Sequence, residues 1–270
     1  MTRQKKKLLY FSSLVVILLL VSAFAGWLSP YDPDLQNYAI ALDPPSISHP
    51  LGTDRYGRDM LSRVLLGSQV SIFSTLVLVA VTAAFGTAAG VFCGCAGKIA
   101  DTVVMRIADV CLAFPGMVFA LAVAAVLDGG IRNAVIALAV VSWPKYARIA
   151  RSRTLSLKNE EYIAAARLSG DTDFQLVFRH ILPNIGGQIL VTAALDIGTI
   201  MMELAALSFL GLGAQPPTAE WGSMISEGRG MLQTCPWVVL APGLGIFVTA
   251  ALFQLLGDTL RDFLDAGKSW

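Results

Sequence analysis

One stretch of this sequence constrains the fold more than any other: residues 70–92 contain no charged side chain. A helix of about 20 apolar residues is long enough to cross the roughly 30 Å hydrocarbon core of a bilayer. Charged residues make up only 14% of the chain, against about 25% in a typical soluble domain. Disordered chains need low hydrophobicity and high charge, so that class is excluded too. The sequence therefore predicts an all-α polytopic membrane protein.

Six apolar runs are long enough to serve as membrane spans. They cover residues 8–28, 70–92, 110–127, 134–146, 189–210 and 238–256, and the fourth is short unless it begins near Ile131. The first run has a rival interpretation as a signal peptide, because lysines precede it and Ala23-Phe24-Ala25 is similar to a cleavage site. Its apolar run exceeds the usual length of about 7–15 residues in a signal peptide. We therefore expect six transmembrane helices, the first retained as an anchor.

The positions of lysine and arginine predict the orientation, because cytoplasmic segments carry an excess of both. With the N-terminus inside, fifteen of the 20 basic residues fall on the cytoplasmic side and five on the outer side. Both termini are therefore expected in the cytoplasm. The expected organisation is a tail and first helix over residues 1–28, an external loop over 29–69, and a five-helix core over 70–270. That core contains a large cytoplasmic loop at 147–180.

The external loop is too long for a simple connector, since most connections have about 4–6 residues. It contains LGTDRYGRDMLSR at residues 51–63, in which Asp54, Arg55, Arg58 and Asp59 have the spacing to pair locally. Two interpretations are open. The loop is either a surface that meets a partner, or a self-satisfied turn that caps the second span.

The cytoplasmic loop predicts two short helices at a sharp bend. Residues 162–168 are good helix formers with three alanines in their middle. Ser169-Gly170-Asp171 breaks this helix, because glycine tolerates positive φ at a helix end. A second helix is expected from Thr172 or Asp173. The loop either contacts another protein through its small alanine side chains or rests as an amphipathic helix in the lipid interface.

Three acidic residues fall at or inside the predicted spans: Asp109, Asp196 and Glu203. A charge at the bilayer centre costs roughly 2.5–3.5 kcal/mol on insertion scales. Asp109 lies near a span end, where it reaches headgroups or acts as an N-cap. Asp196 and Glu203 are two helical turns apart and share a face with Thr199. These three residues form either a pore-facing stripe that meets a cationic or amine-bearing solute, or acids paired or protonated between helices.

The cytoplasmic loop resembles the E-A-A motif of permease subunits of ATP-binding-cassette importers. That motif reads E-A-A, three residues, G, nine residues, I-x-L-P, and Ala165, Ala166, Gly170, Leu182 and Pro183 match it. Ala164 and His180 depart from it in the manner of the peptide/nickel branch, in which RHILPN (residues 179–184) is typical. LGTDRYGRD, MRIADVCLAFPG, LSFLGLGAQPPTAEWG and LGDTLRDFLD resemble the second, C-type permease of that branch.

The resemblance implies a type I importer fold and a set of partners. A second, homologous permease would complete the pore as a heterodimer, and an external solute-binding protein would deliver the solute. Two cytoplasmic subunits would bind ATP and Mg, so this chain would hold no cofactor or metal itself. The residues implied in coupling to those subunits are Ala164, Ala165, Ala166, Gly170, Asp171, Phe174, Leu182 and Pro183.

The implied function is uptake of nickel, a metal chelate, or di- and oligopeptides across the plasma membrane of a prokaryote. The chain itself is not expected to be an enzyme, because the sequence Gly97-Lys98 lacks the rest of a phosphate-binding loop. A net charge of +1 gives no indication of nucleic-acid binding. The alternative function is an ion-gradient-driven secondary transporter, which typically shows inverted repeats. No convincing repeat is present.

Overall fold

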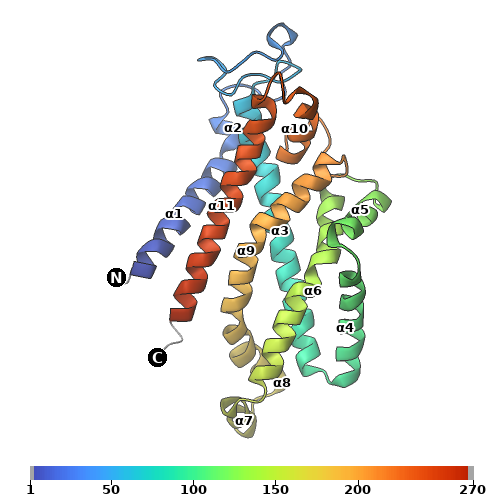
Figure 1. Ribbon diagram of the computed structural model, residues 1–270. Helices are drawn as coiled ribbons and strands as arrows, with labels where there is room; N and C mark the ends of the chain where they lie inside the picture. Colours follow the sequence, from blue (N-terminus) through green and yellow to red (C-terminus); the bar gives the residue numbers. More distant parts are fainter. Residues whose placement is uncertain (1–2, 267–270) are drawn as a thin grey trace.

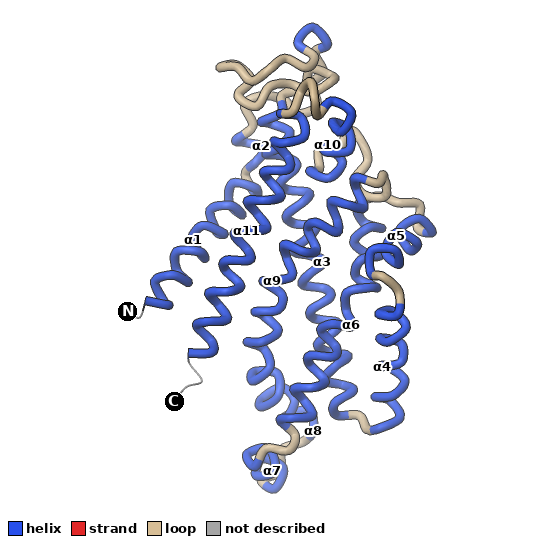
Figure 2. Tube along the Cα trace, in the orientation of Figure 1, coloured by secondary structure: helices blue, strands red, loops and turns tan. Residues whose placement is uncertain are grey.

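The computed structural model describes residues 3–266 and is helical throughout, apart from loops and one isolated bridge between Thr53 and Asp59 (Figures 1 and 2). Residues 267–270, the end of the predicted core, lie outside the described residues. The α-helices are α1 (Arg3–Ala23), α2 (Ala25–Leu28), α3 (Met60–Cys95), α4 (Lys98–Ala113), α5 (Gly116–Val126), α6 (Ile131–Leu157), α7 (Glu161–Leu168), α8 (Asp173–Leu176), α9 (Leu182–Phe209), α10 (Trp221–Gly228) and α11 (Trp237–Ala266).

Four helical segments among the described residues are long and apolar enough to cross a membrane. They are Gln4–Ala23, Met60–Cys95, Asp173–Phe209 and Trp237–Asp265. A fifth span is added if α4 and α5, which are bent by 95°, count as one. The prediction of an all-helical polytopic membrane protein is thus confirmed. The remaining predicted span, the fourth (residues 134–146), corresponds to α6, which is 27 residues long but is not among the segments apolar enough to be counted.

The prediction of one continuous span over residues 110–127 was wrong, because the helix is broken within this range. The chain leaves the helix at Phe114, which is extended (φ −101°, ψ 151°), and α5 begins at Gly116. Pro115 explains the break, because a residue before proline is driven out of the α region. The N-cap role considered for Asp109 was also wrong, because this residue lies inside α4.

Two predicted loop boundaries were also wrong. Helix α3 begins at Met60, so the external loop ends ten residues before the predicted 69. Helix α6 begins at Ile131 and continues to Leu157, so the first eleven residues of the predicted loop 147–180 are helical. The charged residues from Lys145 onward made this part resemble a loop, although three of them pair with acids on other helices.

The helices form an elongated bundle with distinct ends. The long loop after α2 and helix α10 lie at one end, and α7 and α8 lie at the other (Figure 1). Helices α1 and α11 run side by side, and their free ends point away from the long loop (Figure 1). Both chain ends are therefore directed toward the end that carries α7 and α8.

Helices α3 and α6 pack closely at three glycines spaced four residues apart, the first two against backbone and the third against a side chain. A Cβ atom built on Gly86 would lie 2.5 Å from the carbonyl oxygen of Trp143. A Cβ atom on Gly90 would lie 2.3 Å from the carbonyl oxygen of Ala147, and one on Gly94 would lie 2.5 Å from Thr154 Cγ2. This is the small-xxx-small pattern that lets two membrane helices approach closely. Helix α9 then packs against the pair formed by α3 and α6.

Candidate functional site

The connection between α6 and α9 contains the predicted bend. Helix α7 ends at Leu168, and Gly170 adopts φ +96°. The amide of Gly170 donates to the carbonyl of Arg167 at 3.0 Å, and the amide of Asp171 donates to that of Ala166 at 3.1 Å. These bonds satisfy carbonyls that the end of a helix otherwise leaves without partners. The predicted helix and its glycine break are confirmed.

The second short helix begins where the sequence predicts it. Thr172 is the N-cap of α8, and its hydroxyl accepts a bond from the amide of Gln175 at 3.3 Å. The side chain of Gln175 accepts a bond from the amide of Thr172 at 2.8 Å, which completes a capping box. The bend between α7 and α8 is therefore defined by local bonds on both sides of Gly170.

Polar contacts attach this loop to the start of α9. The carboxylate of Asp171 lies 3.1 Å from His180 Nε2 and 3.7 Å from Arg179. The side-chain amide of Asn184 donates to the hydroxyl of Tyr162 at 3.3 Å. Ile163, on the inner side of α7, is buried. These contacts attach α7 and the bend to the beginning of α9 and the turn before it.

A wide helical turn joins α8 to α9. Residues Val177–Ile181 form a π-helical segment in which the amide of Leu182 donates to the carbonyl of Val177. Pro183 follows at the first turn of α9. Proline has no amide hydrogen, and its ring would clash with the carbonyl four residues earlier in a regular helix. The wider turn lets the chain stay helical through Leu182-Pro183.

The surface of α7 presents small side chains and one large apolar residue. Ala164 and Ala165 are exposed, Ala166 is half-buried, and Leu168 is 91% exposed. Phe174 lies elsewhere: its ring stacks on Phe178 at 4.4 Å between centroids. Phe174 also lines an apolar groove of about 750 Å³ between α3 and the α8–α9 region. The predicted coupling residues therefore divide between an exposed tip and this groove.

The predicted intramembrane residues do not all point in one direction. Asp196 is 8% exposed and accepts bonds from Lys145 and, at 2.9 Å, from the Tyr146 hydroxyl, both on α6. Thr199 is exposed, and Glu203 is half-buried. Asp196 thus has the paired environment that was the alternative to a pore-facing stripe. A pore-facing role for Thr199 and Glu203 stays a prediction.

Ion pairs along α6 were missed by the sequence reasoning. Besides Lys145 with Asp196, Arg148 pairs with Asp109 at 2.6 Å, and Arg151 pairs with Asp101. The three basic residues recur every third position, which is the signal that would have placed them on one helix. Within residues 3–266, no group of three or more His, Cys, Asp or Glu is arranged to hold a metal ion.

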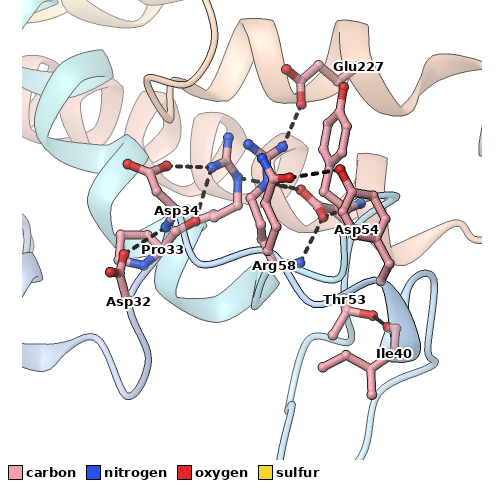
Figure 3. A network of polar contacts seen from close by, with 12 residues as sticks. Asp32, Pro33, Asp34, Ile40, Thr53, Asp54, Arg58 and Glu227 are labelled. Atoms are coloured by element: carbon pink, nitrogen blue, oxygen red, sulfur yellow. Dashed lines mark hydrogen bonds and ion pairs between the residues drawn. The ribbon is translucent and has the colours of Figure 1, made fainter.

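A second polar network lies at the opposite end of the molecule and joins the external loop to α10 (Figure 3). Arg58 pairs with Asp54 at 2.6 Å and with Glu227 at 3.0 Å. Arg63, also buried, pairs with Asp34 at 3.1 Å. The predicted local pairing is confirmed for Asp54 with Arg58. The bond between Arg58 and Glu227 attaches the loop to α10, although the two residues are 169 positions apart in the sequence.

Asp59 caps the second long helix, as one of the two interpretations of this loop proposed. Its carboxylate accepts bonds from the amide of Ser62 at 2.8 Å and from the hydroxyl of the same residue at 2.7 Å. His49 Nδ1 lies 2.9 Å from the same carboxylate. The turn is therefore self-satisfied and caps α3. A role for the outer surface in meeting a partner stays a prediction.

Comparison with known proteins extends these observations to the whole chain. Residues 86–269 match the family described as the binding-protein-dependent transport system inner membrane component. Residues 4–45 match the N-terminal transmembrane domain of oligopeptide transport permease C. The dipeptide transport system permease protein DppC of Haemophilus influenzae is 39% identical over 252 residues, which are 91% of this chain and 85% of the relative. The glutathione transport system permease protein GsiD of Escherichia coli is 44% identical over 247 residues, covering 91% and 82%.

A solved structure of the MetNI methionine ABC transporter in an inward-facing conformation has a similar fold. Its TM-score is 0.54 at 20% sequence identity, and the match covers 71% of this chain and 94% of that chain. The likeness supports a type I permease fold for the bundle. Together with the two family matches, it confirms the resemblance found in the sequence. The chain belongs to the inner-membrane components of binding-protein-dependent transport systems, in the peptide/nickel branch of ABC importer permeases.

Proposed function

We propose that this chain forms half of the pore of an ATP-driven importer of short peptides. The observation that carries the proposal is the extent of the likeness to peptide permeases. Relatives named for dipeptide and for glutathione transport are 39% and 44% identical over 91% of the chain. Nickel uptake is the alternative. Of the two acids that were considered for a cationic solute, Asp196 is bound to Lys145 and Tyr146, which gives less support to a metal ion.

The proposed arrangement has six membrane crossings, with α6 as the one that hydropathy alone does not identify. Both termini and the α7–α8 loop then lie in the cytoplasm of a prokaryote, and the long loop after α2 lies outside. A second, homologous permease completes the pore. Two cytoplasmic subunits bind ATP and Mg, and an external solute-binding protein delivers the peptide. The ends of the bundle described above support this arrangement.

In this proposal α7 and the bend after it are the contact with one ATP-binding subunit. The exposed side chains of Ala164, Ala165 and Leu168 provide a small apolar surface on which another protein can pack closely. Gly170 and Asp171 hold the bend, and Leu182-Pro183 continue it into α9. Because Asp171 is bonded to His180, movement of the ATP-binding subunit is transmitted to the start of α9.

Thr199 and Glu203 are proposed to face the translocation pathway, with Asp196 at its edge. Thr199 is exposed and Glu203 half-buried in this chain. The variants Glu203→Gln and Asp196→Asn should slow uptake while the complex still assembles. Unchanged uptake in both variants would remove these residues from the pathway.

The substrate is tested by uptake in cells that lack the chromosomal permease and express this chain with its partners. We expect labelled dipeptide or glutathione uptake to depend on the chain and labelled nickel uptake to be unaffected. A deficit in nickel alone would overturn the peptide assignment. Uptake that persists without the ATP-binding subunits would favour the secondary transporter.

A further inference from the structure

One face of α9 carries polar side chains, exposed or half-buried, over most of the helix. Thr199 is exposed on it, and Gln188 and Thr192 lie below at the helical spacing that keeps them on the same side. Gln188 is fifteen residues from Glu203, which corresponds to about 22 Å along the helix axis. The polar side chains of this face therefore lead from the proposed pathway toward the end at which α7 and α8 lie.

A cavity of about 480 Å³ opens on the lower part of this face, between α6, α9 and α11. Gly187 brings α11 close, because a Cβ atom at this position would lie 3.3 Å from Leu264. The polar side chains that line the cavity are Arg153, Asn184, Gln188, Thr192, Arg261 and Asp265. Its volume lies within the range of about 300–1,000 Å³ that is typical of small-ligand sites.

The lining combines two arginines with one carboxylate. The Arg153 Nε donates to the side-chain oxygen of Gln188, which holds the guanidinium at the wall of the cavity. Arg261 takes part in none of the ion pairs found among residues 3–266. Guanidinium groups match the planar geometry of a carboxylate and bind it through paired N–H donors. Asp265 adds an acceptor for an ammonium group.

We propose that this cavity is an inner binding site for the transported peptide, occupied before release into the cytoplasm. Arg153 and Arg261 bind a carboxylate of the peptide, and Asp265 accepts its ammonium group. Asn184 and Thr192 supply further hydrogen bonds to the backbone of the peptide. This inference depends on the proposed function, because it assigns the lower end of the same pathway.

The position of the cavity favours a peptide over the headgroup of an anionic phospholipid. Both ligands offer an oxyanion, but the cavity lies on the face of α9 that carries Thr199 and Glu203. Val191, Leu195 and Leu264 also line the cavity, so apolar side chains of a peptide can pack there as well. A peptide would reach the cavity from the pathway, along this face of α9.

The test is binding of labelled alanyl-alanine to the complete transporter in phosphatidylcholine nanodiscs, without nucleotide or external binding protein. The C-terminal amide of the same dipeptide serves as competitor, because it lacks the carboxylate. We expect wild type to bind the free acid about fivefold more tightly than the amide, the upper range for a solvent-exposed ion pair. Arg153→Gln and Arg261→Gln should each reduce this preference, and the double variant should abolish it.

Arg229→Gln is the matched control, because Arg229 is exposed at the opposite end of the bundle, over the ring of Phe209. It should keep the full preference for the free acid. The same preference in the double variant as in wild type overturns the site. So does the absence of measurable binding to a wild-type transporter that imports the dipeptide.

Two further outcomes separate this inference from others. If the arginine variants alter only the retention of phosphatidylglycerol and leave the peptide preference unchanged, the cavity is a lipid site and the inference fails. If wild type shows no ATP-driven uptake of any peptide in proteoliposomes, the proposed function fails first. Uptake by wild type with an unchanged preference in the variants refutes the inner site alone.

Discussion

Gly90 provides the sharpest test of how this bundle is held together. A methyl group at this position would lie 2.3 Å from the carbonyl oxygen of Ala147 and 2.8 Å from the Cβ atom of Ala150. Both atoms belong to α6, and one of them is backbone. A rotamer change cannot relieve the clash, so Gly90→Ala must move α6 away from α3.

The free-energy cost of Gly90→Ala follows from that displacement. Ordinary van der Waals contact begins at 3.4 Å, so the two helices must separate by about 1 Å, which forfeits about a quarter to a half of the dispersion energy across the contact. Overpacking of this kind costs about 1–3 kcal/mol, and the higher helix propensity of alanine offsets up to about 1 kcal/mol. With the full offset, we expect Gly90→Ala to lower the free energy of unfolding by up to about 2 kcal/mol.

Gly186→Ala is the matched control, because Gly186 lies in α9 and no atom lies within 4 Å of its built Cβ. This variant keeps the propensity gain without the clash. The assay is thermal unfolding of the purified transporter in detergent, followed by size exclusion. The two variants differ by the clash alone, about 1–3 kcal/mol, which corresponds to about 2–12 °C in Tm at about 2–4 °C per kcal/mol. If Gly90→Ala is as stable as Gly186→Ala, then close backbone packing does not hold α3 against α6.

Three other predictions concern two ion pairs and the bend after α7. Arg58→Leu removes the nearer guanidinium from the buried carboxylate of Asp54 and leaves only Arg63, at 3.8 Å, so it should cost about 3 kcal/mol in denaturant unfolding; a loss below 1 kcal/mol would contradict this. Gly170→Val forces a side chain into φ +96° at a cost of about 1–3 kcal/mol, so uptake per ATP hydrolysed should fall in an assembled complex. Lys145→Met should destabilise the chain more than Asp196→Asn, because the Lys145 side chain is 53% exposed and Asp196 only 11%; equal losses would refute this asymmetry.

The sequence predicted the parts of this fold that depend on local properties. Apolar run length located most of the long helices, and helix propensity with Gly170 located the bend between α7 and α8. The extent of α6 could not be predicted in this way. Its basic residues lie in a helix because Asp101, Asp109 and Asp196 from two other helices neutralise them, and hydropathy of α6 alone contains no trace of those partners. The spacing of Gly86, Gly90 and Gly94 was visible in the sequence but was not recognised.

These contacts together define which part of the chain moves as a unit. Helix α3 packs closely on α6 at three glycines, and α6 is bound to α9 through Lys145 and Tyr146 on Asp196. The bend after α7 is bonded to the start of α9. A force applied at α7 therefore meets three helices already fixed to one another, and bending α9 alone would break the bonds of the buried Asp196 carboxylate to α6. In the proposed importer these three helices would therefore move together, as a rigid body.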